Sequence, residues 1–232
     1  MFKNTTRTFM CLLAGTGLII TLLTGCKKDE KDTVPITVTD VDGNVYHTVT
    51  IGTQTWMVEN LKTTRYRNGD PIPHVNNNAD WNQIPTPAYC SYNTSGYAAD
   101  TFGRLYNWYA VAEGAALAPE GWHIPTDADW QLLITYLGGE AGAGGKLKEA
   151  GNTHWLTPNT GATNTTGFTA LPGGVRSGSG VYQEKGTAGY YWSATEYSAN
   201  YAGYVVFSNS NADAHNTGTI KMQGFSVRCI KN

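Results

Sequence analysis

Charged residues are few in this chain: lysine, arginine, aspartate and glutamate together make up 15% of it. The 16 basic residues form no patch and are outnumbered by 18 acidic ones. Because nucleic-acid binding needs a basic surface that neutralises phosphates, the composition gives no support to a DNA- or RNA-binding function. Gly, Asn, Thr and Tyr are plentiful instead, which favours short strands and turns whose irregular backbone is satisfied by side-chain amides and hydroxyls.

Cysteine is scarce as well, and two of the four cysteines accompany an apolar run near the N-terminus. The run, Phe9–Leu23, has fifteen residues, which suits a signal peptide and falls short of the roughly 20 that a membrane-spanning helix needs. Basic residues precede it, and Leu-Thr-Gly-Cys26 ends it, which resembles the bacterial lipoprotein box. We therefore expect residues 1–25 to be a signal peptide that is removed, and Cys26 to carry a diacylglycerol and further acyl chains such as palmitate. An uncleaved anchor is the alternative.

The segment after Cys26 is densely charged and reads Lys-Lys-Asp-Glu-Lys-Asp. Such a segment is typical of a solvated tether, which we assign to residues 26–36. It also resembles the export signal that sends lipoproteins of Bacteroidetes-type bacteria to the outer face of the outer membrane. Lys27 stands where many lipoproteins retained at the inner membrane have aspartate. We expect a lipid-anchored protein of the outer membrane that faces the cell exterior and whose membrane contact is the lipid on Cys26.

Residues 37–232 are expected to form one α+β domain of short antiparallel sheets, two main helices and long ordered loops. Asp42-Gly43 and Ile51-Gly52-Thr53 predict turns between the first strands. Residues 65–99 show no periodicity and predict a long ordered loop. Later strands are expected within residues 167–176, 189–198, 202–211 and 224–232.

Two segments show the helical spacing of apolar residues. The first, residues 101–114, ends at Gly114 and shows this spacing at Phe102, Leu105, Tyr106 and Tyr109. The second begins at Thr126, which caps the helix together with Asp129 three residues later, and stops at Gly138-Gly139. Its buried stripe is expected to comprise Trp130, Leu133, Ile134 and Leu137.

Six segments carry a family resemblance: "DVDGNVYHTVTIGTQTWMVENLKTTRYRNGDPIP", "FGRLYNWYAV", "GWHIPTDADW", "GFTALPGGVR", "GYYWSATE" and "GFSVRCIKN". In this order they resemble the Fibrobacter succinogenes major paralogous domain. That family is similar to the C-type-lectin-like fold of the formylglycine-generating enzyme group. The resemblance implies that the N- and C-terminal strands pair at the base of the domain, with a loop-rich half above them, and it implies no settled activity.

The sequence predicts no enzyme, no cofactor and no metal site. Formylglycine-type oxidation needs two cysteines a few residues apart, whereas Cys90 and Cys229 are far apart in the chain. The five histidines show no paired spacing, and no D-x-D-x-D-G calcium loop occurs. Ser193 and Glu196 have no matched histidine and no nucleophile elbow.

Cys90 and Cys229 are the two cysteines that remain once Cys11 leaves with the signal peptide and Cys26 is lipidated. In an oxidising compartment we expect them to form a disulfide. Related chains often carry a cysteine where this one has Ala118, which leaves the pairing open. The alternative is that both thiols are buried and unpaired, as small hydrophobic side chains.

The aromatic residues divide into a core group and a candidate site. Trp56, Trp108, Trp122 and Trp130 are expected to be buried. Rigid aromatic side chains at loop tips stack on ligands, so the predicted ligand-binding cluster is Tyr190, Trp192, Tyr197 and Tyr201. The alternative is that residues 190–196 form a buried strand.

Together these features predict a non-catalytic binding or adhesion module on the cell surface, with a glycan or a protein as ligand. A structural or accessory subunit of a larger surface assembly is the alternative function.

Overall fold

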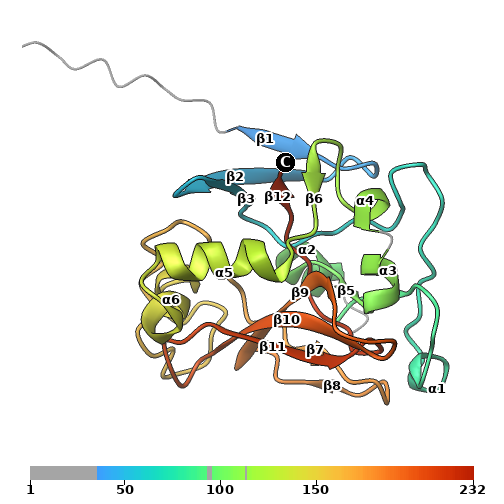
Figure 1. The fold of residues 1–232 in the computed structure, drawn as a ribbon. Coiled ribbons are helices and arrows are strands. Elements are labelled where there is room, and N and C mark those ends of the chain that lie inside the picture. Colours follow the sequence, from blue (N-terminus) through green and yellow to red (C-terminus); the bar gives the residue numbers. More distant parts are fainter. Residues whose placement is uncertain (1–35, 93–95, 113) are drawn as a thin grey trace, which may run out of the picture. The chain divides into compact units, whose positions relative to one another are not determined.

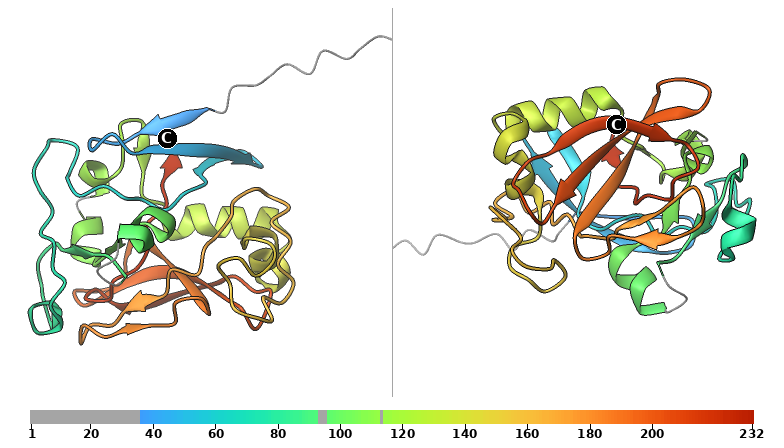
Figure 2. Two further views of the ribbon diagram at one scale, coloured as in Figure 1. Left: turned by 180° about the vertical axis from the view of Figure 1, so that it is seen from behind. Right: turned by 90° about the horizontal axis from the view of Figure 1, so that it is seen from below.

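The computed structural model describes residues 36–92, 96–112 and 114–232. Residues 35–232 form one contact unit. The predicted signal peptide, Cys26 and most of the predicted tether lie outside the described residues. The described chain is an α+β domain with several short antiparallel sheets, as predicted (Figures 1 and 2).

The domain begins and ends in one five-stranded antiparallel sheet, with the strand order β1-β2-β3-β12-β6. Its strands are β1 (Thr37–Thr39), β2 (Val45–Ile51), β3 (Gln54–Met57), β6 (Trp122–His123) and β12 (Ile230–Lys231). The turns predicted at Gly43 and Gly52 connect the first three strands, and φ is +85° and +62° at these glycines, a conformation that glycine adopts without strain. Ile230 of β12 lies opposite Trp56 of β3, which confirms the expected pairing of the N- and C-terminal strands.

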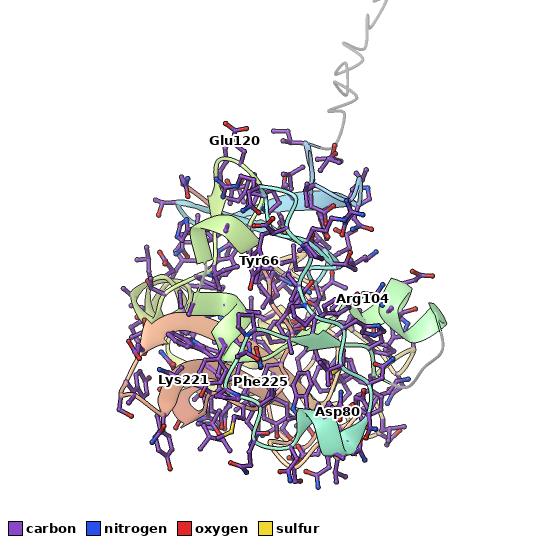
Figure 3. All side chains as sticks on the ribbon, turned by 90° about the vertical axis from the view of Figure 1, so that its right-hand side faces the viewer. Tyr66, Asp80, Arg104, Glu120, Lys221 and Phe225 are labelled. Atoms are coloured by element: carbon purple, nitrogen blue, oxygen red, sulfur yellow. The ribbon has the colours of Figure 1, made fainter. Side chains whose placement is uncertain are left out.

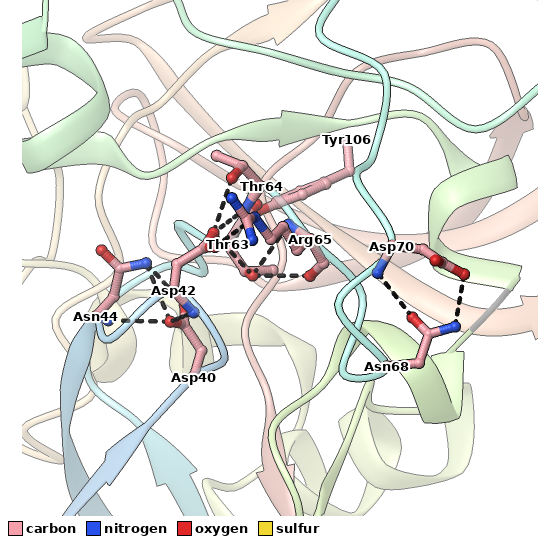
Figure 4. Close-up of polar contacts among 9 residues, drawn as sticks. All are labelled: Asp40, Asp42, Asn44, Thr63, Thr64, Arg65, Asn68, Asp70 and Tyr106. Carbon is pink, nitrogen blue, oxygen red and sulfur yellow. Dashed lines mark hydrogen bonds and ion pairs between the residues drawn. The ribbon is translucent and has the colours of Figure 1, made fainter.

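Side chains of the β1–β2 turn close it and link it to a later segment (Figure 4). Asp40 Oδ1 accepts hydrogen bonds from the backbone N–H groups of Asp42 and Asn44, both at 2.9 Å. Asp42 Oδ2 accepts a hydrogen bond from the Thr64 hydroxyl at 2.8 Å, and Arg65 Nε lies 3.5 Å from its other oxygen. The carboxylates of this turn are therefore used within the domain to hold residues 63–65.

The second main sheet has three antiparallel strands in the order β11-β10-β9. They are β9 (Ala188–Glu196), β10 (Tyr201–Ser208) and β11 (His215–Ile220). Figure 1 shows helix α5 (Asp127–Tyr136) between this sheet and the five-stranded one. Residues directly opposite each other in a sheet share a face. Tyr204 lies opposite Trp192 and Val206 opposite Tyr190, so these side chains are on one face, whereas Val205 and Phe207 pack with α5 on the other.

Helix α5 confirms the sequence prediction in its start, its buried stripe and its end. The Thr126 hydroxyl accepts a hydrogen bond from the Asp129 N–H, and Asp129 Oδ2 accepts one from the Thr126 N–H at 2.8 Å, which completes a capping box. The predicted stripe is buried and contacts Ile51, Trp56 and Ile230 of the first sheet as well as the second sheet. Helix α6 (Glu140–Leu147) follows and was not predicted. In the described ranges, no helix combines the length and the apolarity needed to cross a bilayer.

The helix predicted over residues 101–114 is wrong. Helix α2 (Gly96–Phe102) ends before Gly103, whose φ of +75° breaks the helix. Strand β5 (Leu105–Tyr106) follows, then the short helices α3 (Trp108–Ala112) and α4 (Gly114–Leu117). Residues 105 and 106 are extended because they pair with β4 (Tyr89–Cys90). Tyr106 also pairs with Phe225 through two backbone hydrogen bonds. The predicted long loop over 65–99 contains β4 and the four-residue helix α1 (Asn78–Trp81).

Four positively charged side chains of the described chain are buried: Lys148, Arg176, Lys221 and Arg228. Lys148 Nζ donates to three backbone carbonyls, those of Thr160 at 3.0 Å and of Ser208 and Asn211 at 2.7 Å. Burial lowers the pKa of Lys148 to about 8, so the ammonium is still mostly charged at neutral pH. These hydrogen bonds tie two loops to the end of α6. The sequence gives no signal for this burial, because lysine is normally exposed.

Arg228 and Lys221 are held in a related way. The guanidinium of Arg228 donates to Asn60 Oδ1 at 2.6 Å and to the carbonyl of Phe168, and it lies 4.2 Å from the Phe168 ring centroid. Lys221 Nζ pairs with Glu196 and lies 4.5 Å from the Trp108 ring centroid. Positive groups over aromatic rings are stabilised by the ring quadrupole, which compensates part of the cost of burying them.

Candidate functional site

The candidate site lies on the face of the three-stranded sheet that is turned away from α5. Tyr190 of β9 and Tyr204 of β10 lie on this face, with their ring centroids 5.9 Å apart. Phe225, from the segment before β12, packs against both: its ring is stacked on Tyr190 at 4.9 Å and tilted against Tyr204 at 5.0 Å. Phe225 is held there by its backbone hydrogen bonds to Tyr106 of β5. Three aromatic rings from distant parts of the sequence thus form one apolar floor.

A short hairpin forms the wall beside these rings. Its strands are β7 (Val175–Arg176) and β8 (Tyr182–Gln183), and Figure 1 shows them next to β9, β10 and β11. The buried guanidinium of Arg176 fixes the hairpin to the α1 region by donating to the carbonyls of Val75 and Asn76. It also lies 4.5 Å from the Trp81 ring centroid and 4.9 Å from that of Tyr182. The hairpin is therefore held in place by contacts with the α1 region, whose residues do not line the hollow.

Floor and wall enclose a hollow of about 190 Å³. Its rim is polar: the hollow is lined by Val175, Ser177, Gln183, Glu184, Tyr190, Tyr204, Thr219, Gln223 and Phe225. This volume is below the roughly 300–1,000 Å³ of pockets for drug-sized molecules, so the hollow suits one small ring or one side chain. Most of its accessible lining is polar, which suits a ligand that carries many hydroxyl groups.

Among the residues that the structure describes, Glu184 is the one charged side chain that lines the hollow. Its φ is +61°, a conformation that non-glycine residues adopt at a cost and mostly where the surrounding structure requires it. The Glu184 carbonyl accepts backbone hydrogen bonds from Thr187 and Ala188, both at 3.0 Å. Its Oε2 accepts a hydrogen bond from the Tyr190 hydroxyl at 2.5 Å. Backbone and side chain of this acid are thus both fixed at the rim.

The charge of Glu184 affects both tyrosines of the hollow. Burial raises the pKa of Tyr190, and the hydrogen bond to Glu184 and its charge raise it further. Burial and the Glu184 charge also raise the pKa of Tyr204. Both phenols are therefore neutral at physiological pH and remain hydrogen-bond donors.

Only one of the four predicted ligand-binding residues lines this hollow. Tyr190 does, whereas Trp192 is completely buried and its Nε1 donates to the Tyr106 carbonyl, so it cannot contact a ligand. Tyr197 and Tyr201 are each 48% exposed. They lie at the β9–β10 turn, where the Tyr197 hydroxyl donates to Asp127 of α5 at 2.6 Å, on the other side of the sheet. The predicted cluster is therefore not one site.

The residues of the hollow that sequence reasoning missed include Glu184, Tyr204, Thr219, Gln223 and Phe225. Of these residues, Tyr204 alone could have been found from strand alternation. It lies in the β-rich segment that begins at Tyr201, at a position on the same face of the sheet as Tyr190. The other four are brought in by tertiary structure.

The predicted Cys90–Cys229 disulfide is absent from the structure, and both thiols are free and buried. Cys90 packs with Trp81, Ala88 and Leu105 in one cluster, whereas Cys229 belongs to the larger core around Tyr106. Burial raises the pKa of both thiols. The two cysteines therefore correspond to the alternative expectation, that of small buried hydrophobic side chains.

The other residues considered for chemistry are engaged elsewhere. Ser193 is buried, and its carbonyl accepts a hydrogen bond from Trp108 Nε1 at 2.9 Å, whereas Glu196 pairs with Lys221. His123, at the entrance of α5, bonds Asn232 at 2.7 Å. In the part of the chain that the structure describes, no group of three or more His, Cys, Asp or Glu side chains is placed to hold a metal ion.

These observations define an α+β domain whose first and last strands share a sheet and which carries a small aromatic hollow on a second sheet. The model of the Fibrobacter succinogenes major domain matches residues 49–231, and the chain belongs to this family. Comparisons with curated proteins and with solved structures found no match.

Proposed function

We propose that this protein is a surface lipoprotein of the outer membrane that binds a glycan in the hollow of Tyr190, Tyr204 and Phe225. The observation that carries the proposal is the composition of the hollow. Aromatic rings pack against the apolar C–H faces of sugar rings, and the surrounding amides, hydroxyls and carboxylate match the hydroxyl groups at the ring edge. The volume of about 190 Å³ suits a single sugar residue at the end or edge of a chain.

The same residues favour binding over catalysis. Glycoside hydrolysis ordinarily uses two carboxyl groups about 5–9.5 Å apart, whereas the hollow is lined by one, that of Glu184. Its Oε2 already accepts the Tyr190 hydroxyl. A non-catalytic module that retains its ligand is the function this arrangement supports.

The proposed C-type-lectin-like character of the fold rests on two features. The N- and C-terminal strands are joined in one sheet, and loops, short strands and the three-stranded sheet lie beyond α5 (Figure 1). In this proposal the hollow needs no calcium, because its polar side chains bind the ligand directly.

The lipid anchor that we propose fits the position of the hollow in the domain. The described chain begins at Ile36, next to β1 of the five-stranded sheet, and the hollow belongs to the other sheet, across α5 (Figure 2). An anchor that precedes Ile36 attaches at the end of the domain remote from the hollow.

Lipidation is tested by mass spectrometry of the protein from membranes of its host. Residues 1–25 should be absent and Cys26 should carry acyl chains, since two or three chains are enough for stable anchoring at about 0.8 kcal/mol for each buried methylene. Cys26→Ser should release the protein from the membrane or leave it uncut. Recovery of wild-type chains with an intact, unmodified N-terminus would show that the proposed anchor is wrong.

Glycan binding is tested with two tyrosines of β10, one inside the hollow and one outside it. Full-length protein, purified in detergent, is screened on a glycan array, and its affinity for the best ligand is measured by calorimetry. We expect Tyr204→Ala to weaken binding about five- to thirtyfold, because loss of one well-packed aromatic contact costs roughly 1–2 kcal/mol. Tyr201→Ala removes an exposed tyrosine of the same strand and should leave the affinity unchanged.

A loss with Tyr201→Ala and none with Tyr204→Ala would move the site to the β9–β10 turn. An array on which no glycan binds would contradict the proposal altogether. Urea denaturation of both variants checks that neither result comes from unfolding.

A further inference from the structure

We infer that the ligand of the hollow is an amino sugar whose ammonium group binds beside Glu184. The inference rests on the proposed glycan-binding function and names the substrate class of that same site. It is argued from the charge at the rim, from the groups left without partners and from the rings of the floor.

The hollow has an uncompensated negative charge. Glu184 is exposed and forms no ion pair with any other described residue. The next residue, Lys185, is directed elsewhere: its Nζ lies 5.4 Å from the Tyr92 ring centroid and 4.9 Å from that of Phe102. No lysine, arginine or histidine lines the hollow. A carboxylate without a positive neighbour disfavours an anionic ligand and attracts a cationic one.

The Glu184 carboxylate keeps one oxygen free to accept hydrogen bonds from a ligand. The Tyr190 hydroxyl donates to Oε2 of Glu184, and no hydrogen bond from the described chain reaches Oε1. An ammonium group has three donors and no acceptor, so it complements this free carboxylate oxygen.

The floor favours the same ligand. A cation near the face of a tyrosine ring is attracted by the ring quadrupole. Tyr190 and Tyr204 are partly exposed and supply two such rings, whereas Phe225 is buried behind them. Their packing against one another, and the fixed turn at Glu184, mean that the site is formed before the ligand arrives. Preorganisation of this kind reduces the entropy lost on binding.

The remaining rim distinguishes a sugar from a lysine side chain, which carries the same ammonium group. Gln183 and Thr219 present an amide and a hydroxyl group at the hollow, whereas the Ser177 hydroxyl is already hydrogen-bonded to Ser179 and Val181. The free amide and hydroxyl match the hydroxyls of a sugar ring, whereas the four-carbon stem of lysine has no hydrogen-bonding group for them. The composition of the rim therefore favours an amino sugar over a protein ligand.

The test compares tetramers that differ in one substituent. Calorimetry at about pH 6, where the amine is protonated and glutamate is ionised, measures full-length protein against a glucosamine tetramer, an N-acetylglucosamine tetramer, cellotetraose and a tetralysine peptide. We expect the glucosamine tetramer to bind at least tenfold more tightly than either neutral saccharide, because a hydrogen bond to a charged group contributes about 1.5–3 kcal/mol. Its affinity should fall as salt is added.

Glu184→Gln keeps an acceptor for the Tyr190 hydroxyl and removes the charge. It should lower the affinity for the glucosamine tetramer about tenfold and leave the neutral saccharides unchanged. Glu120→Gln is the matched control, since Glu120 is exposed and lies at the opposite end of the domain from Phe225 (Figure 3). It should change no affinity.

The outcomes separate this inference from the function on which it rests. Equal binding of all three saccharides, with no effect of Glu184→Gln, would overturn the amino-sugar inference and leave glycan binding intact. If no saccharide binds, both are overturned. If tetralysine binds more tightly than every saccharide, the amino-sugar inference is overturned in favour of a protein ligand.

Discussion

Replacing Arg228 by methionine is expected to lower the free energy of unfolding by about 3–5 kcal/mol. The guanidinium is completely buried and donates to Asn60 Oδ1 and to the carbonyls of Phe168 and Thr169. Methionine has a similar length but no donor, so these oxygens lose their partner inside the core. A buried acceptor without a hydrogen bond costs about 1–3 kcal/mol, and the loss of the contact with the Phe168 ring adds to this. Urea denaturation monitored by tryptophan fluorescence measures the change.

Two further variants show whether the geometry of this group matters. Arg228→Lys keeps the charge but not the planar array of donors. Its free energy of unfolding should therefore fall by less than that of the methionine variant, and the decrease should still be measurable. Arg65→Met removes an exposed arginine whose Nε lies 3.5 Å from Asp42, and surface pairs of this kind contribute little. An Arg228→Met protein within about 1 kcal/mol of the wild type would contradict the assigned role.

Replacing Trp130 by alanine is expected to cost a similar amount, about 3–5 kcal/mol, for a different reason. Trp130 is completely buried, and its ring centroid lies 4.8 Å from that of Trp56 and 6.1 Å from those of Phe168 and Tyr191. Its ring contacts Trp56 of one sheet and Tyr191 of the other. Alanine leaves a cavity that rigid aromatic neighbours cannot fill. With a total stability of about 5–15 kcal/mol for a typical domain, this variant should approach the limit of folding.

Thr126→Ala is the comparison for Trp130→Ala in the same helix. It removes the hydroxyl that accepts the Asp129 N–H, and loss of such a cap costs about 1 kcal/mol. The two free energies of unfolding, measured side by side, should therefore differ by at least about 2 kcal/mol. The reverse order would mean that the helix register or its packing is wrongly assigned.

The parts of the fold that were predicted correctly depend on short-range interactions. The start of α5 is encoded by Thr126 and Asp129, three residues apart, and its buried stripe by the spacing of Trp130, Leu133 and Ile134. The turn at Gly43 depends on its own backbone and on the neighbouring Asp40 side chain. The helix predicted over 101–114 failed because strand pairing with Tyr89 and Phe225, both distant in sequence, overrode the local helical spacing.

The site depended even more on long-range pairing. Tyr190 was identified because aromatic residues are dense around it, yet that same density drew in Trp192, which lies on the same face and is completely buried beneath Phe225. Glu184 carries no sequence signal for its left-handed backbone, since glycine or asparagine is the usual residue there. Phe225 reaches Tyr190 because its backbone pairs with Tyr106 and because the next residue, Ser226, pairs with β9. Both the misplaced and the missed residues follow from contacts that no local pattern encodes.

The buried cations described above affect how the fold of this domain responds to low pH. Unfolding at low pH is driven largely by carboxylates that lose their native partners on protonation. Lys148, Arg176 and Arg228 donate to backbone carbonyl and side-chain amide oxygens, and neither of these titrates in the physiological range. Of the four buried cations, Lys221 is the one paired with a carboxylate, that of Glu196. Three cross-links of the core therefore keep all their hydrogen-bond partners below about pH 4, where aspartate and glutamate lose their charge.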